Sequence, residues 1–113
     1  MPEAAGAGMA GYTYLWEFLV APEHAAEFAR HYGPDGTWVS LFRRAAGYID
    51  TSLLRDRSNP RRFITIDRWE SAQAHAAFRA DFAHEYAELD ARCAHLTLQE
   101  SPLGDFEAAG RPR

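Results

Sequence analysis

The segment YTYLWEFLV, residues 12–20, has apolar side chains on both faces of the β-strand that its aromatic and β-branched composition predicts. Side chains alternate between the two faces of a strand, so one face carries four aromatic rings and a valine, and the other carries two leucines around a glutamate. The first set is Tyr12, Tyr14, Trp16, Phe18 and Val20, and the second is Leu15, Glu17 and Leu19. A strand of this kind is typical of a sheet that is covered on both sides.

Turn and capping residues divide the rest of the chain. Pro22 suits the first turn of a helix, Gly33-Pro34 ends that helix, and Ser71 is a plausible N-cap for a longer one. The expected helices cover residues 23–32, 37–45 and 71–93, and the expected strands cover residues 12–20, 47–56, 61–69 and 95–101. This order predicts an α+β ferredoxin-like βαββαβ sandwich, with a four-stranded antiparallel sheet and its helices on one face.

Helices on one side would leave the opposite side of the sheet uncovered. The strands hold more apolar residues than one helix layer needs, namely Leu15, Leu19, Ile49, Leu53, Ile64 and Ile66. An exposed apolar sheet face of that size usually meets a partner, and a second copy related by a two-fold axis is the simplest one. We therefore expect a homodimer.

Size and composition limit the class of protein. A chain of 113 residues with a net charge of −4 is expected to form one domain, and the acidic balance disfavours nucleic-acid binding. Arginines cluster between residues 55 and 62, and we interpret them as the solvated tip of a hairpin. The single cysteine, Cys93, follows Leu89 at helical spacing, which predicts a buried apolar role and suits the reducing cytoplasm.

The two ends of the chain differ from its middle. Residues 1–11 are rich in Ala and Gly and are expected to form a flexible leader, residues 12–106 the domain, and residues 107–113 a flexible tail. No apolar run reaches the length of a membrane span, and the N-terminus lacks a signal pattern. We expect a cytoplasmic protein without a membrane partner.

The end of the third expected strand is unusual, because an acid, a base and a large apolar residue, Asp67-Arg68-Trp69, directly precede a helix. Either this corner is a structural latch or it forms the lip of a pocket. The run LFRRAAGYIDTSLLRD followed by FITIDRWESAQAHAAFRADF resembles the antibiotic biosynthesis monooxygenase-like group of the dimeric α/β-barrel superfamily. The resemblance is carried by Trp38 to Phe42, Gly47-Tyr48, Asp67 to Ser71, Phe78 and Leu89-Asp90.

This resemblance implies a dimer whose sheets pack face to face, with a pocket between each sheet and its helices. Some members are cofactor-independent oxygenases, in which the anion of a phenol or hydroquinone passes an electron to O₂. Such a protein supplies an apolar cavity, a base and a partner for the anion. The sequence lacks a phosphate-binding loop and a zinc motif, so no cofactor is expected. Haem degradation is disfavoured, because Arg79 stands where such relatives place the iron-binding histidine.

Asp67 and His75 are the candidate catalytic bases. Asp67 shares a strand face with Trp69, and a buried, unpaired acid would have a raised pKa that suits a base. The commoner arrangement is an ion pair, with Arg68, Arg79 or Arg43 as its partner, and we favour this latch. His75 can accept a proton near neutral pH, but its offset from the apolar helix stripe favours an exposed or rim position.

The expected pocket is mainly aromatic. Its candidate residues are Trp16, Trp38, Phe42, Arg68, Trp69, Phe78, Arg79, Phe82 and Tyr86. Trp69 would form a wall, and Arg68 or Arg79 would stabilise an anion. We therefore expect a cofactor-independent monooxygenase of a phenolic or quinol-like substrate. The alternative is a non-catalytic dimer that binds a small aromatic ligand or has a solid core, and isomerase chemistry would use the same groups.

Overall fold

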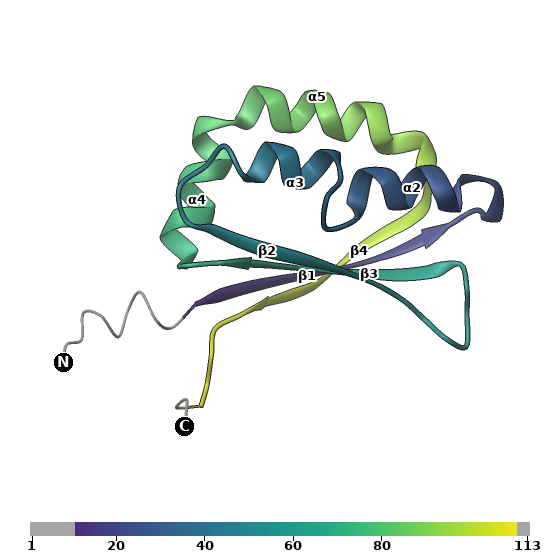
Figure 1. Ribbon diagram of the computed structural model, residues 1–113, viewed down its shortest axis with the longest axis horizontal. Helices are drawn as coiled ribbons and strands as arrows, with labels where there is room; N and C mark the ends of the chain where they lie inside the picture. Colours follow the sequence, from purple (N-terminus) through teal and green to yellow (C-terminus); the bar gives the residue numbers. More distant parts are fainter. Residues whose placement is uncertain (1–10, 111–113) are drawn as a thin grey trace.

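The computed structural model describes residues 11–110 (Figure 1). The expected leader therefore lies almost entirely outside the described residues, as does the end of the expected tail. The elements are β1 (Tyr12–Val20), η1 (Pro22–His24), α2 (Ala25–Tyr32), α3 (Thr37–Phe42), β2 (Tyr48–Arg55), β3 (Arg62–Trp69), α4 (Ala72–Asp81), α5 (Ala83–Cys93), η2 (Ala94–Leu96) and β4 (Thr97–Phe106).

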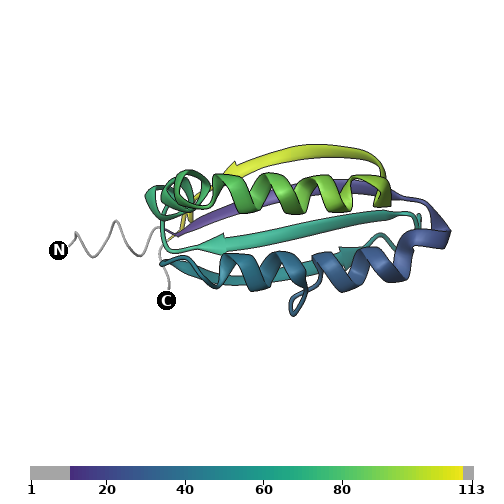
Figure 2. The same cartoon turned by 90° about the horizontal axis from the view of Figure 1, so that it is seen from above.

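The four strands form one antiparallel sheet in the order β2-β3-β1-β4. All helices lie on one side of this sheet, as Figure 1 shows. Seen from above, they form two rows, with α2 and α3 in one row and α5 in the other (Figure 2). The predicted ferredoxin-like α+β fold is confirmed.

The core lies between the sheet and the helices. Phe18 and Val20 of β1 and Phe63 and Trp69 of β3 are buried there, because alternation places them on the helix-covered face. The helices contribute Phe28, Tyr32, Trp38, Val39, Leu41, Phe42, Phe78, Leu89 and Cys93. The predicted division of β1 into two faces is confirmed, and so is the buried position of Cys93.

The long helix expected over residues 71–93 is two helices. Its start is confirmed, since Ser71 Oγ accepts a hydrogen bond of 3.0 Å from the Ala74 backbone N–H. The break falls at Phe82, where φ is −115° and ψ is 25°. α4 and α5 consequently point in different directions (Figure 1). The break allows Phe78 to pack at the end of the sheet while Leu89 and Cys93 pack further along it, so tertiary packing overrides a continuous apolar stripe.

The last strand begins later and runs further than expected, from Thr97 to Phe106. Residues 94–96 form a 3₁₀ turn instead. Leu96 and Leu98 therefore do not share a strand face: Leu96 is buried, whereas Leu98 is 59% exposed. The period-two alternation of a strand does not extend across this turn.

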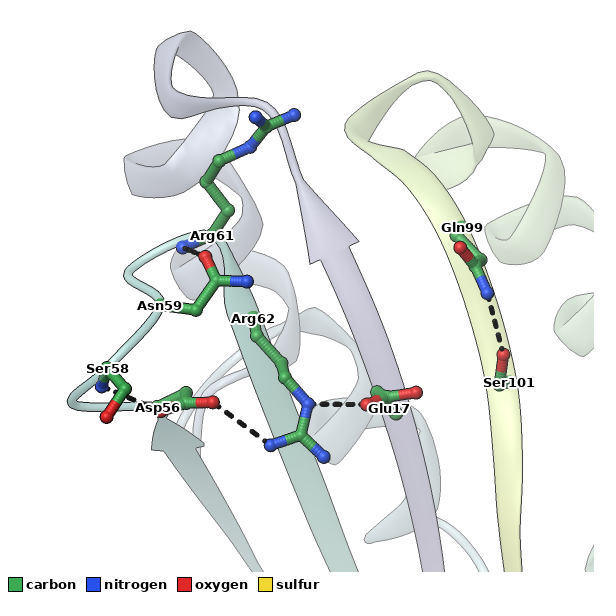
Figure 3. A network of polar contacts seen from close by, with 8 residues as sticks. All are labelled: Glu17, Asp56, Ser58, Asn59, Arg61, Arg62, Gln99 and Ser101. Atoms are coloured by element: carbon green, nitrogen blue, oxygen red, sulfur yellow. Dashed lines mark hydrogen bonds and ion pairs between the residues drawn. The ribbon is translucent and has the colours of Figure 1, made fainter.

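The side of the sheet away from the helices, which we name the outer face, mixes apolar residues with paired charges. Its apolar residues are Leu15, Leu19, Leu54, Ile64, Ile66 and Phe106. Arg62 contacts both Glu17 and Asp56 there, as Figure 3 shows, and Arg68 pairs with Asp50 at 2.8 Å. Arg62 therefore belongs to this ion-pair network rather than to a solvated hairpin tip.

Candidate functional site

A cavity of about 410 Å³ lies between the sheet and the helices. Every strand and four helices contribute to its lining, which is Tyr14, Trp16, Phe18, Tyr32, Trp38, Val39, Phe42, Thr51, Thr65, Asp67, Arg79, Tyr86, Asp90 and Glu100. Cavities of roughly 300–1,000 Å³ are the usual size for small-molecule sites. The space therefore suits a small ligand.

The cavity has aromatic walls. Alternation along β1 places Tyr14 and Trp16 side by side, with ring centroids 5.9 Å apart and ring planes within 2° of parallel. The helices supply Trp38, which meets Tyr86 edge-on at 4.9 Å and lies 6.0 Å from Phe42. Planar aromatic surfaces of this kind favour contact with a flat ring.

Asp67 of β3 is an acid in the cavity wall, and no arginine within residues 11–110 forms an ion pair with it. Its Oδ1 accepts a hydrogen bond of 2.7 Å from the Thr51 hydroxyl. Burial raises the pKa of this carboxyl to about 6, although the Thr51 hydrogen bond works in the opposite direction. A carboxyl with this pKa is half ionised near pH 6 and can accept a proton at neutral pH.

The arginines expected to pair with Asp67 lie elsewhere. Arg68 bonds Asp50 on the outer face, and the nearest described partner of Arg43 is Asp35, at 3.5 Å. Arg79 lines the cavity with its guanidinium carbon 4.1 Å from the centre of the Tyr86 ring. None of the three forms an ion pair with Asp67 among residues 11–110, so the favoured arginine latch is wrong.

The corner formed by Trp69 is closed. Trp69 is 1% exposed and packs against Phe42, Tyr48, His75 and Phe78, with ring centroids 5.2–5.8 Å apart. Its large ring therefore joins the end of β3 to α3 and α4 and does not line the cavity.

His75 is half-buried rather than exposed, because its ring packs against Tyr12 and Tyr14 at 5.3 Å as well as against Trp69. Burial lowers the pKa of His75, and the positive charge of Arg79 lowers it further. His75 is separate from the cavity that contains Asp67. The two candidate bases therefore do not act on one ligand position.

The structure brings together six of the eleven candidate residues. Those that line the cavity are Trp16, Trp38, Phe42, Asp67, Arg79 and Tyr86, and those outside it are Arg68, Trp69, His75, Phe78 and Phe82. Arg68 lies on the wrong sheet face, Phe78 is fully buried, and Phe82 packs under the guanidinium of Arg44.

Sequence reasoning missed several polar lining residues. Thr65 could have been found, because it lies two residues before Asp67 on the same strand face. Thr51, Asp90 and Glu100 come from elements whose register or rotation depends on the tertiary fold.

No group of three metal-ligating side chains gathers anywhere within residues 11–110. Within the same range, no helix is long and apolar enough to cross a membrane.

Comparison with protein families gives one match, to the sequence model described as antibiotic biosynthesis monooxygenase, over residues 12–88. The matched range contains Asp67, Thr51 and the aromatic walls of the cavity. A search of curated proteins finds no match.

Solved structures share the fold. A variant of SnoaB, a cofactor-independent oxygenase from Streptomyces nogalater, is 21% identical, with a TM-score of 0.68 and coverage of 90% of this chain and 96% of that one. A proposed antibiotic biosynthesis monooxygenase from Deinococcus radiodurans is 16% identical, with a TM-score of 0.70 and the same coverages. A third, from Nitrosomonas europaea, is 14% identical, with a TM-score of 0.68 and coverages of 88% and 91%.

Proposed function

The chain belongs to the antibiotic biosynthesis monooxygenase family, and from that premise we propose that it is a cofactor-independent monooxygenase of a phenolic or quinol-like aromatic substrate. One observation supports this most strongly: Asp67, a carboxyl group that pairs with no arginine of the described residues, stands in the wall of an aromatic cavity. The oxygenase activity of the structural relative SnoaB, which shares the fold, is consistent with the same chemistry.

In the proposed reaction, Asp67 takes the proton of a substrate hydroxyl, so that the O–H bond of the substrate breaks and a carboxylic acid forms. The resulting electron-rich anion passes an electron to O₂, and the two radicals combine at a ring carbon. The peroxide anion formed there takes the proton back from Asp67. Loss of the hydrogen on the same ring carbon as a proton and cleavage of the O–O bond then leave one oxygen atom as a product carbonyl, and the other leaves as water. Arg79, the cation of the cavity wall, is placed to stabilise negative charge on the substrate or on the reduced oxygen.

The pH dependence of the rate follows from the ionisation of Asp67. The base is the carboxylate, and the pKa of this group is about 6, so activity is expected to rise as the pH increases from 5 to 7 and then to level off. The measurement is kcat/KM for oxygen uptake across this range. A rate that is flat between pH 5 and 7 would exclude Asp67 as the base.

The proposal as a whole is tested by oxygen uptake with a panel of phenols, naphthols and quinols, with product identification by mass spectrometry. His75→Ala is expected to retain activity, because His75 lies outside the cavity. A loss in His75→Ala with wild-type activity in Asp67→Asn would transfer the role of base to His75. A panel compound that binds without consuming oxygen would favour the alternative of a ligand-binding protein, and one that is isomerised would show isomerase chemistry.

We also propose that two copies pack their outer faces together to form a homodimer. Six apolar residues lie there, two of which are about half exposed, Leu54 at 50% and Phe106 at 51%. Its charges are already paired as Glu17–Arg62 and Asp50–Arg68, so covering the face would not isolate a charge.

Ile66→Glu is expected to convert a dimer into a monomer and to weaken association by at least about 100-fold, because it places an unpaired charge on the outer face. Sedimentation velocity at micromolar concentration measures this. The matched control is Ala77→Glu on the exposed side of α4, which should leave the dimer intact. A wild-type chain that sediments as a monomer would contradict the proposal.

A further inference from the structure

A series of hydrogen-bonded hydroxyl groups leads from Asp67 in the cavity wall to β2, the strand at the edge of the sheet. Thr51 Oγ1 donates to Asp67 Oδ1 at 2.7 Å, and the Tyr48 hydroxyl lies 2.7 Å from the same Thr51 oxygen. Thr51 and Asp67 line the cavity, whereas Tyr48 lies behind them against Trp69. The oxidation chemistry described above uses only Asp67 of these three.

An irregularity in β2 makes this series of hydrogen bonds possible. Residues three apart in a regular strand point to opposite faces, so Tyr48 and Thr51 should not meet. The pairing of β2 with β3 shifts between Tyr48 and Asp50, which gives Tyr48 opposite Trp69 and Thr51 opposite Asp67. The extra residue restores both hydroxyls to the helix-covered face. β-Bulges that redirect side chains in this way occur often beside active sites.

The number of protons on the Tyr48, Thr51 and Asp67 side chains sets the direction of the two hydrogen bonds. A threonine hydroxyl has a single proton, and an ionised carboxylate can only accept. Since Thr51 gives its proton to Asp67, the Tyr48 hydroxyl must donate to Thr51. Burial raises the pKa of Tyr48, so its proton is retained through the neutral range. Oδ2 of Asp67 accepts no hydrogen bond from the described residues, and it is the oxygen left for a ligand.

We propose that Thr51 and Tyr48 are positioning residues for Asp67, holding Oδ1 through a one-way chain of hydrogen bonds so that Oδ2 alone meets the substrate proton. This inference rests on the role proposed above for Asp67. The Thr51 hydrogen bond also limits the rise in the pKa of Asp67. Burial disfavours the ionised carboxylate, and this hydrogen bond partly stabilises it.

Several other groups face Asp67 and must be considered in any titration. Tyr14 of β1 is its neighbour across the sheet, Arg79 comes from α4, and Tyr86 and Asp90 come from α5. Burial raises the pKa of Tyr86, so this phenol stays neutral near pH 6. The variants proposed below leave Arg79 and Asp90 unchanged.

The test is a titration of the Asp67 carboxyl in the protein without substrate, by NMR of chains labelled with ¹³C at the aspartate side-chain carboxyl. Asp67→Asn assigns the signal. Thr51→Val, which keeps the shape and removes the hydroxyl, is expected to raise the midpoint by about 1 pH unit. Thr51→Ser should restore the wild-type midpoint, and Tyr48→Phe should raise it by a smaller amount. Circular dichroism establishes that each variant is folded.

An unchanged midpoint in Thr51→Val would overturn the proposal, as would equal midpoints for Thr51→Ser and Thr51→Val. If Thr51→Val does not fold, the difference between wild type and Tyr48→Phe decides, because Tyr48 lies outside the cavity. The titration needs no substrate, so its outcome is independent of whether the chain oxidises phenols. With an active substrate, a positioning role further predicts that Thr51→Val lowers kcat at pH 8 while KM stays within about twofold.

Discussion

Asp67→Asn is expected to lower kcat for oxygen uptake by about 100-fold or more, because a positioned base typically contributes 10²–10⁴-fold. Asparagine has nearly the same shape and can still accept the Thr51 hydrogen bond, so the substitution removes the base and leaves the wall of the cavity in place. The measurement is steady-state oxygen uptake at pH 7.5 with the best substrate of the panel. Asp81→Asn, an exposed acid at the end of α4, is the matched control.

The same substitution is expected to stabilise the fold above pH 6. The pKa of Asp67 is raised from 3.8 to about 6, so the folded state binds more protons than the unfolded state between these values. The free energy of unfolding of the wild type therefore falls as the pH rises through this window. At about 1.4 kcal/mol per pH unit, the loss is at most about 3 kcal/mol, and Asp67→Asn should avoid it.

Urea unfolding at pH 4 and at pH 7.5 measures this difference. Lower activity together with unchanged or higher stability at pH 7.5 would identify Asp67 as a functional residue that costs stability. A variant that loses stability equally at both pH values would instead show that Asp67 is a structural residue.

Trp69→Ala is expected to lower the free energy of unfolding by about 3–5 kcal/mol, the usual cost of removing a buried large aromatic ring. Trp69 is 1% exposed and joins β3 to α3 and α4 through Phe42 and Phe78. A loss of this size is a large part of the stability of a small domain. Trp69→Phe, which keeps one ring, should lose an intermediate amount of stability. It provides a folded variant for the measurement if Trp69→Ala does not fold.

Trp16→Ala is the matched comparison, because Trp16 has the same side chain but lines the cavity and is only partly buried. It should cost less than about half as much stability and should weaken binding of a flat aromatic ligand. Urea unfolding monitored by far-UV circular dichroism measures both variants. Equal losses of stability would contradict the distinction between a structural corner and a ligand wall.

Much of the fold follows from local patterns. The apolar side chains of residues 12–20 predicted the strand β1 and its two faces, and the Ser71 cap predicted the start of α4. Sequence patterns were less informative where the conformation of a segment depends on packing against several other elements. The break at Phe82 and the 3₁₀ turn at residues 94–96 satisfy packing across the sheet, which no local period records.

The candidate site shows the same division. Strand alternation grouped Trp16 with the aromatic residues of its own strand and Asp67 with Trp69, and both Trp16 and Asp67 line the cavity. The partner of Asp67 was decided by the register of β2 on β3, where a bulge puts Thr51 opposite Asp67 and Asp50 opposite Arg68. Side-chain chemistry and periodicity are local properties, so the sequence by itself determined which faces are apolar and which residues could act as a base. Which hydroxyl meets which carboxyl depends on cross-strand register and helix rotation, which many distant contacts set together, and only the tertiary structure decided it.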